Sequence, residues 1–390
     1  MVVLFLLSFL LAAGNGAIFA LLPDIQEAAN LPDWSLGVVV AASFGAGLVS
    51  QLALARFADR GHARLLLVGG AVVGATGYVI VGLGEQLLTV TAGRAIAGLG
   101  IGAVYPAGRK LLVARYPDRA GLMLGRFLAS DVTGFVLGAP IGAELAERFG
   151  VAVAFTCFAC AIVACLPVVL RTRWPVSAES VATARADRGV LRRLLGRSRL
   201  RAGLAMGAAT FFAIGVFDTL WARYLTDLGA STRFIGVTLA CFGVPMALVA
   251  TFAGKLADRR GPLPIGLVAG FAGVPFMISY GQLSVPVTLA VVSTVHAVID
   301  GLGMPASQAT VAAECAEHEV ASGQGLLSSV QMSTAALSAL LIAPIYDRYG
   351  AGASFGLAGV VMALALAAAW HQSGLGRRRS ADRVPATATA

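Results

Sequence analysis

Long apolar runs, each long enough to cross a membrane, follow one another along almost the whole chain. The hydrocarbon core of a bilayer takes about 20 apolar residues in a helix, so each run predicts one membrane-spanning helix. Short segments marked by proline, glycine or charged residues separate the runs. The twelve predicted spans cover residues 2–22, 36–58, 65–84, 88–113, 121–145, 150–170, 202–225, 234–256, 263–283, 285–310, 322–344 and 351–371.

The first run begins at Val2 without a basic segment before it or a small-residue cleavage site after it. It therefore predicts the first span rather than a removable signal peptide. The missing polar lead-in also raises the expectation of a true start upstream of Met1.

Composition excludes a water-soluble protein. Of the 390 residues, 58% are hydrophobic and only 13% are charged, against about 25% charged in soluble domains. The net charge of +9 would suggest nucleic-acid binding in a soluble chain. In a membrane protein it indicates basic cytoplasmic loops, so we expect a lipid bilayer and no nucleic acid as partner.

The basic residues predict the orientation. If the first span runs outward, 23 Lys and Arg fall on cytoplasmic connections and 4 on outer ones. The positive-inside rule then puts both termini in the cytoplasm, in a multi-pass protein of the cytoplasmic membrane. One cytoplasmic connection, residues 314–319, is acidic.

An internal repeat divides the chain. We expect a six-helix half over residues 1–170, an Arg-rich cytoplasmic linker over 171–201, a second half over 202–371 and a disordered tail over 372–390. The repeated segments are ADR at 58–60 and 257–259, ERFG and DRYG at 147–150 and 347–350, and AGLG and DGLG at 97–100 and 300–303, at offsets of 199, 200 and 203 positions.

Three motifs resemble those of the major facilitator superfamily, over the whole chain. The loop after the second span of each half carries an Asp-Arg core, in GKLADRRG at 254–261 and in ARFADRGHAR at 55–64. The fourth span has Arg94 followed by Gly98, Gly100 and Gly102, then Pro106. The fifth span has Gly125, Gly134, Gly138 and Gly142 at the spacing of an antiporter pattern, with Ala139 and Ala143 at its usual Pro and Gly positions and Pro140 one residue late.

The resemblance implies an all-α membrane fold of twelve helices in two pseudo-symmetric halves, and transport by alternating access around a central site. It implies that Arg94 takes part in proton transfer or substrate binding. It also implies a conformational latch at the loop motifs, although a static helix-end charge cluster is the alternative. The latch residues are Asp59, Arg60, Asp258 and Arg259.

Ionisable residues within predicted spans point to function, because each costs about 2.5–3.5 kcal/mol at a helix centre. His296 and Asp300 are four residues apart and share a helix face, which suits proton exchange. Asp131 has Arg94 as its expected partner. Asp218 lies beside aromatic residues, which suits a cationic or aromatic ligand or, alternatively, a solvated helix end. The candidates for proton coupling are Arg94, Asp131, Asp218, His296 and Asp300.

Other polar or aromatic residues within spans are weaker candidates for the substrate cavity, since each could equally form a helix–helix hydrogen bond. They are Asn15, Trp221, Gln308 and Gln331.

These observations predict a proton-coupled secondary transporter that exports a small molecule and functions as a monomer without a cofactor. No phosphate-binding GxxxxGK[ST] loop is present, and the CxxC at Cys157 and Cys160 lies in an apolar run without further metal ligands. An importer on the same fold is the alternative. More distant alternatives are a non-transporting receptor and a hydrolase using Ser354, which lies in a GxSxG pattern.

Overall fold

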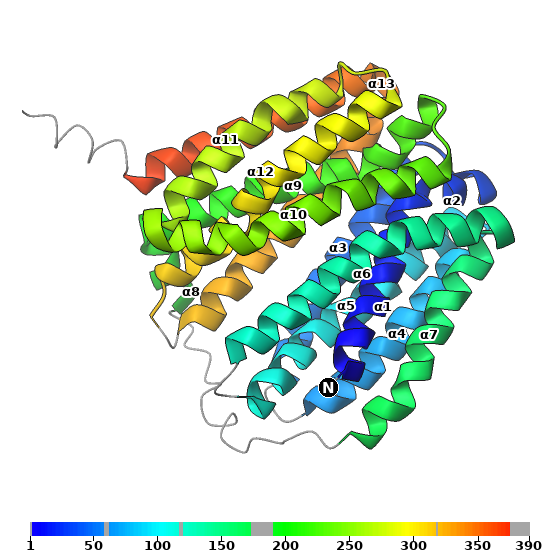
Figure 1. Cartoon of the computed structure of the whole chain (residues 1–390), viewed down its shortest axis with the longest axis horizontal. Coiled ribbons are helices and arrows are strands. Elements are labelled where there is room, and N and C mark those ends of the chain that lie inside the picture. The colour runs from blue at the N-terminus through cyan, green and yellow to red at the C-terminus, as the bar shows by residue number, and fades with distance from the viewer. Residues whose placement is uncertain (1, 58–61, 117–119, 173–189, 317–318, 375–390) are drawn as a thin grey trace, which may run out of the picture.

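The computed structural model describes residues 2–57, 62–116, 120–172, 190–316 and 319–374. All regular structure in these ranges is helical (Figure 1). The helices are α1 (Val2–Ala20), α2 (Leu22–Ala28), α3 (Ser35–Phe57), α4 (Ala63–Gly82), α5 (Leu87–Arg115), α6 (Ala120–Phe149), α7 (Val151–Arg171), α8 (Val190–Gly196), α9 (Ser198–Asp227), α10 (Thr232–Arg260), α11 (Pro262–Tyr280), α12 (Pro286–Ala313) and α13 (Val320–Ser373).

The predicted layout of twelve long helices is confirmed in the described ranges. The 54-residue α13 contains the last two predicted spans. Gly350, with φ 76°, is non-helical within it and separates the two spans. Nine helices, α13 counted once, meet length and composition criteria for a membrane span within the described residues. Apart from these, α6 and α10 are also 30 and 29 residues long.

The helices form two bundles, α1 and α3–α7 in one half and α9–α13 in the other (Figure 1). The repeat reappears in the packing. Gly98 of α5 lies against the backbone of Ser43, and Gly301 of α12 lies against the backbone of Met246. Each partner in the second pair stands 203 positions after its counterpart in the first, so the same contact is built twice.

The repeated ERFG and DRYG segments also share a backbone conformation. Gly150 has φ 89° and Gly350 has φ 76°. Residues that carry a side chain rarely adopt a positive φ. Glycine therefore stands between one helix and the next at the same place in each half.

The glycines of the fifth predicted span bring α6 against α1. A methyl group added at Gly134 would overlap the backbone of Phe9, and one at Gly138 would overlap the backbone of Ala13. Close backbone approach replaces the hydrophobic driving force that is absent between helices in lipid. The direct role of this glycine pattern is therefore helix packing.

We expect Gly138→Ala to destabilise the N-terminal half by about 1–3 kcal/mol, because the new methyl group has to push α1 away from α6. Gly356→Ala is the matched control, since nothing lies within 4 Å of its added methyl group in α13. Thermal unfolding of the purified protein in detergent measures both. Equal unfolding temperatures for the two variants would contradict the packing role.

The acidic connection after α12 is neutralised by arginines at the start of the second half. Arg197 forms an ion pair of 2.7 Å with Glu319, and Arg199 forms one of 3.4 Å with Glu314. We call this end of the molecule, which also holds α8 and the start of α1, the α8 end. The opposite end is the α2 end (Figure 1).

Candidate transport site

Arg94 is a fully buried cation in the first half. It lies on α5, its Nη1 donates a 3.0 Å hydrogen bond to Oδ1 of Asn15 on α1, and its guanidinium lies 5.2 Å from the ring centroid of Phe19. Its Nε and Nη2 have no hydrogen-bond partner within the described part of the chain. A buried guanidinium without a partner costs free energy. The two unused N–H groups are therefore available to hydrogen-bond a ligand.

Asp131 is held by neutral groups and not by Arg94, contrary to the pairing that we expected. Its Oδ1 accepts hydrogen bonds from the hydroxyls of Tyr105 on α5 and Ser8 on α1, the latter at 3.5 Å. Arg94 instead uses Asn15. The helices bring both ionisable residues to the centre of the first half, but different neighbours satisfy them.

We expect Asp131→Ala to lower the free energy of unfolding by about 1–3 kcal/mol, because the hydroxyl of the partly buried Tyr105 loses its acceptor. Asp131→Asn is the control, since the amide oxygen still accepts a hydrogen bond. Thermal unfolding in detergent measures both variants. An alanine variant as stable as the asparagine variant would show that the hydroxyls find other acceptors.

His296 and Asp300 lie together on α12 of the second half. His296 Nε2 is 3.7 Å from Asp300 Oδ1, and its Nδ1 shares a 2.9 Å hydrogen bond with the Tyr280 hydroxyl. The ring of Phe276 stacks on the imidazole with centroids 5.3 Å apart. His296 is buried, whereas the Asp300 side chain keeps 26% of its surface exposed. The pair therefore joins a fixed imidazole to a carboxylate that a proton can reach.

Asp218 on α9 is half-buried and has neither a hydrogen bond nor an ion pair to any described residue. Its neighbour Phe217 stacks on Trp221 at 4.5 Å and on Phe242 at 5.2 Å. Trp221 is almost fully buried and donates a 2.9 Å hydrogen bond to Thr238. Trp221 thus supports the aromatic cluster from inside the half.

The remaining candidates are dispersed. Gln331 is buried with an unpartnered amide nitrogen within the described structure, whereas Gln308 is exposed. Of the latch residues, Asp59 and Arg60 lie outside the described residues, as does the Asp258 side chain, and Arg259 is exposed near the end of α10.

Ser354 has no arrangement for nucleophilic catalysis among the described residues. It is fully buried, and its hydroxyl donates a 3.0 Å hydrogen bond to the carbonyl of Gly350. This bond stabilises the helix start after the break in α13. The GxSxG pattern here belongs to a helix boundary rather than to a strand–turn–helix elbow.

A polar cluster at the α2 end joins the two halves, and we call it the interhalf cluster. It was not predicted from the sequence. Arg223 of α9 forms ion pairs of 3.0 Å with Asp33 of the first half and 2.6 Å with Asp347 of its own half. The Arg223 side chain is only 10% exposed and lies over the Tyr346 ring, 4.7 Å from its centroid. Arg223 is therefore the most buried cation between the halves at this end.

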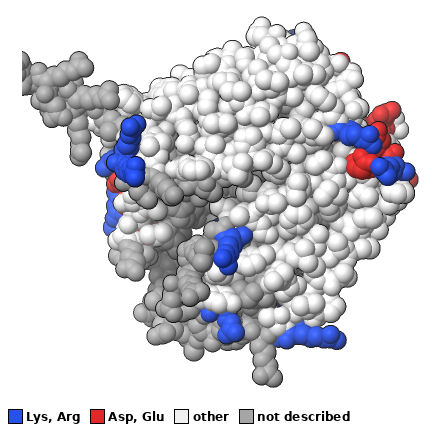
Figure 2. All heavy atoms as spheres, viewed as in Figure 1, with Lys and Arg blue, Asp and Glu red and all other residues white. Residues whose placement is uncertain are grey.

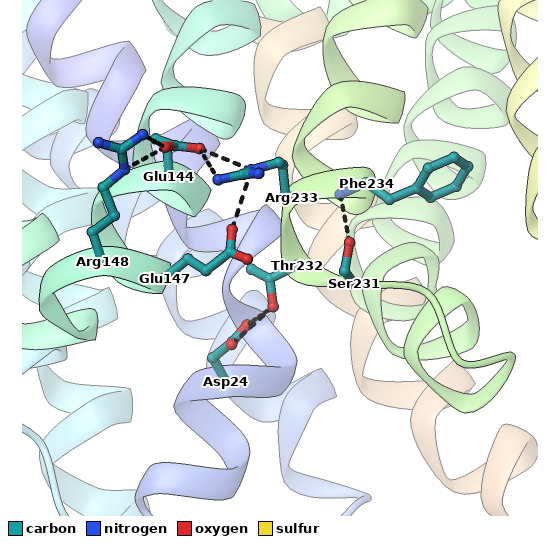
Figure 3. Close-up of polar contacts among 8 residues, drawn as sticks. All are labelled: Asp24, Glu144, Glu147, Arg148, Ser231, Thr232, Arg233 and Phe234. Carbon is teal, nitrogen blue, oxygen red and sulfur yellow. Dashed lines mark hydrogen bonds and ion pairs between the residues drawn. The ribbon is translucent and has the colours of Figure 1, made fainter.

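A second part of the interhalf cluster lies between α10 and α6 (Figure 3). Arg233 forms ion pairs of 2.8 Å with Glu144 and 3.2 Å with Glu147. Thr232 donates a 3.0 Å hydrogen bond to Asp24 of α2. Burial raises the pKa of the Asp24 carboxyl, and the bond from Thr232 partly offsets that effect. Together these contacts join the two halves at the α2 end.

Few charged residues lie on the side of the molecule between its two ends. In the view of Figure 2, most of the described charges lie toward the edges of the molecule, one basic group lies near its middle, and the rest of the wall is uncharged. A pocket of about 740 Å³ opens beside the cluster at the α2 end, lined by residues that include Asp24, Asp33, Glu147 and Arg223. The only sequence signal for the cluster was that Arg148, Arg223, Arg233 and Arg348 interrupt otherwise cation-free connections.

Solved transporters share this fold. A bacterial homologue of the human lysosomal transporter Spinster, in an inward-facing and occupied conformation, superposes with a TM-score of 0.80 at 15% identity, over 99% of this chain and 98% of that one. A D-xylose-proton symporter gives 0.78 at 13% identity, over 95% and 96%. The sequence profile of the Major Facilitator Superfamily matches residues 4–225 and 203–388. This chain belongs to the major facilitator superfamily.

Relatives within the superfamily include proteins named for drug resistance. The Multidrug resistance protein MdtG of Citrobacter koseri (strain ATCC BAA-895) is 28% identical over 282 residues, which cover 70% of this chain and 69% of the relative. MdtG of Escherichia coli (strain K12 / DH10B) is also 28% identical over 282 residues, covering 70% and 68%. This superfamily member is thus a multi-pass membrane transporter.

Proposed function

We propose that this chain is a proton-coupled secondary active transporter that exports a small molecule by alternating access. The observation that carries the proposal is the His296–Asp300 pair in the middle of α12. A carboxylate that is 26% exposed and lies 3.7 Å from an imidazole, inside an apolar bundle, is suited to take up and release a proton. The unpartnered N–H groups of Arg94 and the carboxylate of Asp218, which interact electrostatically, would supply polar contacts for a substrate.

Export is favoured by the relatives at 28% identity, whose name denotes multidrug resistance. Import of a nutrient or metabolite is the second candidate, and the fold shared with a D-xylose-proton symporter supports it at 13% identity. The proton gradient is the proposed energy source in both cases, and one chain suffices for the cycle.

We place the α8 end in the cytoplasm of a bacterial cell, because the Lys and Arg residues concentrate on connections at that end. Both termini then lie in the cytoplasm. Because the interhalf cluster joins the halves at the α2 end, we assign this conformation to the inward-facing state of the proposed cycle. The Asp-Arg loop motifs with Asp59, Arg60, Asp258 and Arg259 would close the opposite end in the alternate state.

Inside-out vesicles test this function. The vesicle lumen is acidified, and collapse of the pH gradient is followed with a pH-sensitive dye as cationic, neutral and anionic compounds are added in turn. Collapse with one chemical class, absent in vesicles without the protein, supports proton-coupled export. Accumulation of a sugar, acid or amino acid in right-side-out vesicles, with no collapse in inside-out ones, would favour import.

A further inference from the structure

Two unpaired charges of opposite sign lie at nearly the same depth in the two halves. Arg94 is seven residues from the α2-end terminus of α5, and Asp218 is nine residues from the α2-end terminus of α9. At the helical rise, these separations are about 10 Å and about 14 Å. Each residue acts electrostatically on the other, yet no ion pair joins them in the described structure.

Arg94 is preorganised for an anion. Asn15 fixes one nitrogen of the guanidinium, and the Phe19 ring lies beside it. Nε and Nη2 keep unsatisfied N–H groups in a fully buried side chain, and these two donors match the two oxygens of a carboxylate.

Asp218 offers the complementary end. Its carboxylate is half-buried, and neither a hydrogen bond nor an ion pair from any described residue engages it. The stacked rings of Phe217, Trp221 and Phe242 begin at the adjacent residue. A carboxylate next to aromatic faces favours an organic cation over a hydrated inorganic one.

The geometry points to a zwitterionic substrate that carries an aromatic or apolar body, with its carboxylate on Arg94 and its ammonium group on Asp218. Such a molecule neutralises both charges at once and links the two halves, whereas a simple cation leaves Arg94 unpaired. This inference rests on the proposed transport function, because it assigns the substrate class to the same central site.

The test is equilibrium binding to the purified full chain in lipid nanodiscs, without any gradient. The probes share one phenyl body: phenylalanine is the zwitterion, phenethylamine the cation and hydrocinnamate the anion. We expect the wild type to prefer the zwitterion to either singly charged probe by about tenfold or more, because each charged contact adds affinity.

Two variants should give a crossed pattern. Arg94→Gln is expected to remove the advantage of phenylalanine over phenethylamine, and Asp218→Asn the advantage over hydrocinnamate. Arg94→Lys retains the charge and should keep part of the preference. Thermal unfolding checks that each variant is folded. Because Asp218 is only partly buried, its variant stays informative even where the Arg94→Gln protein does not fold.

Phenethylamine binding as tightly as phenylalanine to the wild type would overturn the inference and indicate a plain cation site. An equal loss of affinity for all three probes in both folded variants would also overturn the inference. The two side chains would then maintain the site together, and neither would bind its own charge of the substrate. Failure of pH-gradient collapse in vesicles, with the crossed binding pattern intact, would instead reject proton coupling and leave the substrate class standing.

Discussion

Gradient-driven transport is expected to fall to background in Asp300→Asn, while exchange of substrate across the membrane should continue near the wild-type rate. The physical reason is that the amide cannot ionise, so no proton leaves or joins the pair with His296. Exchange needs only alternating access of the loaded protein, and an asparagine of the same size leaves that step intact.

The measurement compares pH-driven efflux with counterflow in the same proteoliposomes. Asp300→Glu retains a carboxylate and should keep measurable coupling. Asp131→Asn is the matched comparison, because that acid is already satisfied by Tyr105 and Ser8. We expect the Asp131 variant to remain coupled. Coupling that survives in Asp300→Asn and disappears in Asp131→Asn would move the proton site to the first half.

Arg223→Gln should shift the conformational equilibrium toward opening at the α2 end by about tenfold or more, because hydrogen-bonded charges are worth about 1.5–3 kcal/mol. The arginine holds Asp33 of one half and Asp347 of the other from a nearly buried position. Its removal breaks the link between the halves and leaves the half-buried Asp347 without its cation. The exposed Arg233 pairs, by contrast, are expected to contribute about 0.2–1 kcal/mol each.

Spin labels at the exposed Leu83 of the first half and Val285 of the second report the separation of the halves at this end. Arg148→Gln is the matched control, because Arg148 pairs with Glu144 on its own helix and has no ion pair to a described residue of the other half. We expect a longer-distance population to grow in Arg223→Gln and to stay unchanged in Arg148→Gln. Identical distance distributions in both variants would show that apolar packing alone closes the α2 end.

Part of the candidate site could be predicted from the sequence. His296 and Asp300 are four residues apart, and that spacing alone puts them on one face of α12. The pairing of Arg94 with Asp131 was predicted from adjacent helices, and the structure gives Asn15 and Tyr105 in its place. Adjacent helices do not specify rotation about their axes, and rotation decides which side chains meet.

The glycine patterns illustrate the same limit. Their spacing in the fifth predicted span indicated close helix approach, and α6 does approach a neighbour closely at Gly134 and Gly138. The identity of that neighbour as α1, more than a hundred residues earlier, follows only from the packed bundle. Likewise, Ser354 matched a hydrolase pattern, and only its bond to Gly350 reveals a helix start.

The sequence by itself determined the long membrane-spanning helices, their order, the division into two related halves and the ionisable residues within them; the short helices α2 and α8 came only from the structure. Membrane insertion depends on the length and apolar character of each segment, which are local properties. Only the tertiary structure decided which charges are paired, which remain open, and that Arg223 and Arg233 join the two halves at the α2 end. Those contacts join residues 86 to 190 positions apart, and no local period along the chain encodes the rotation and tilt that bring them together.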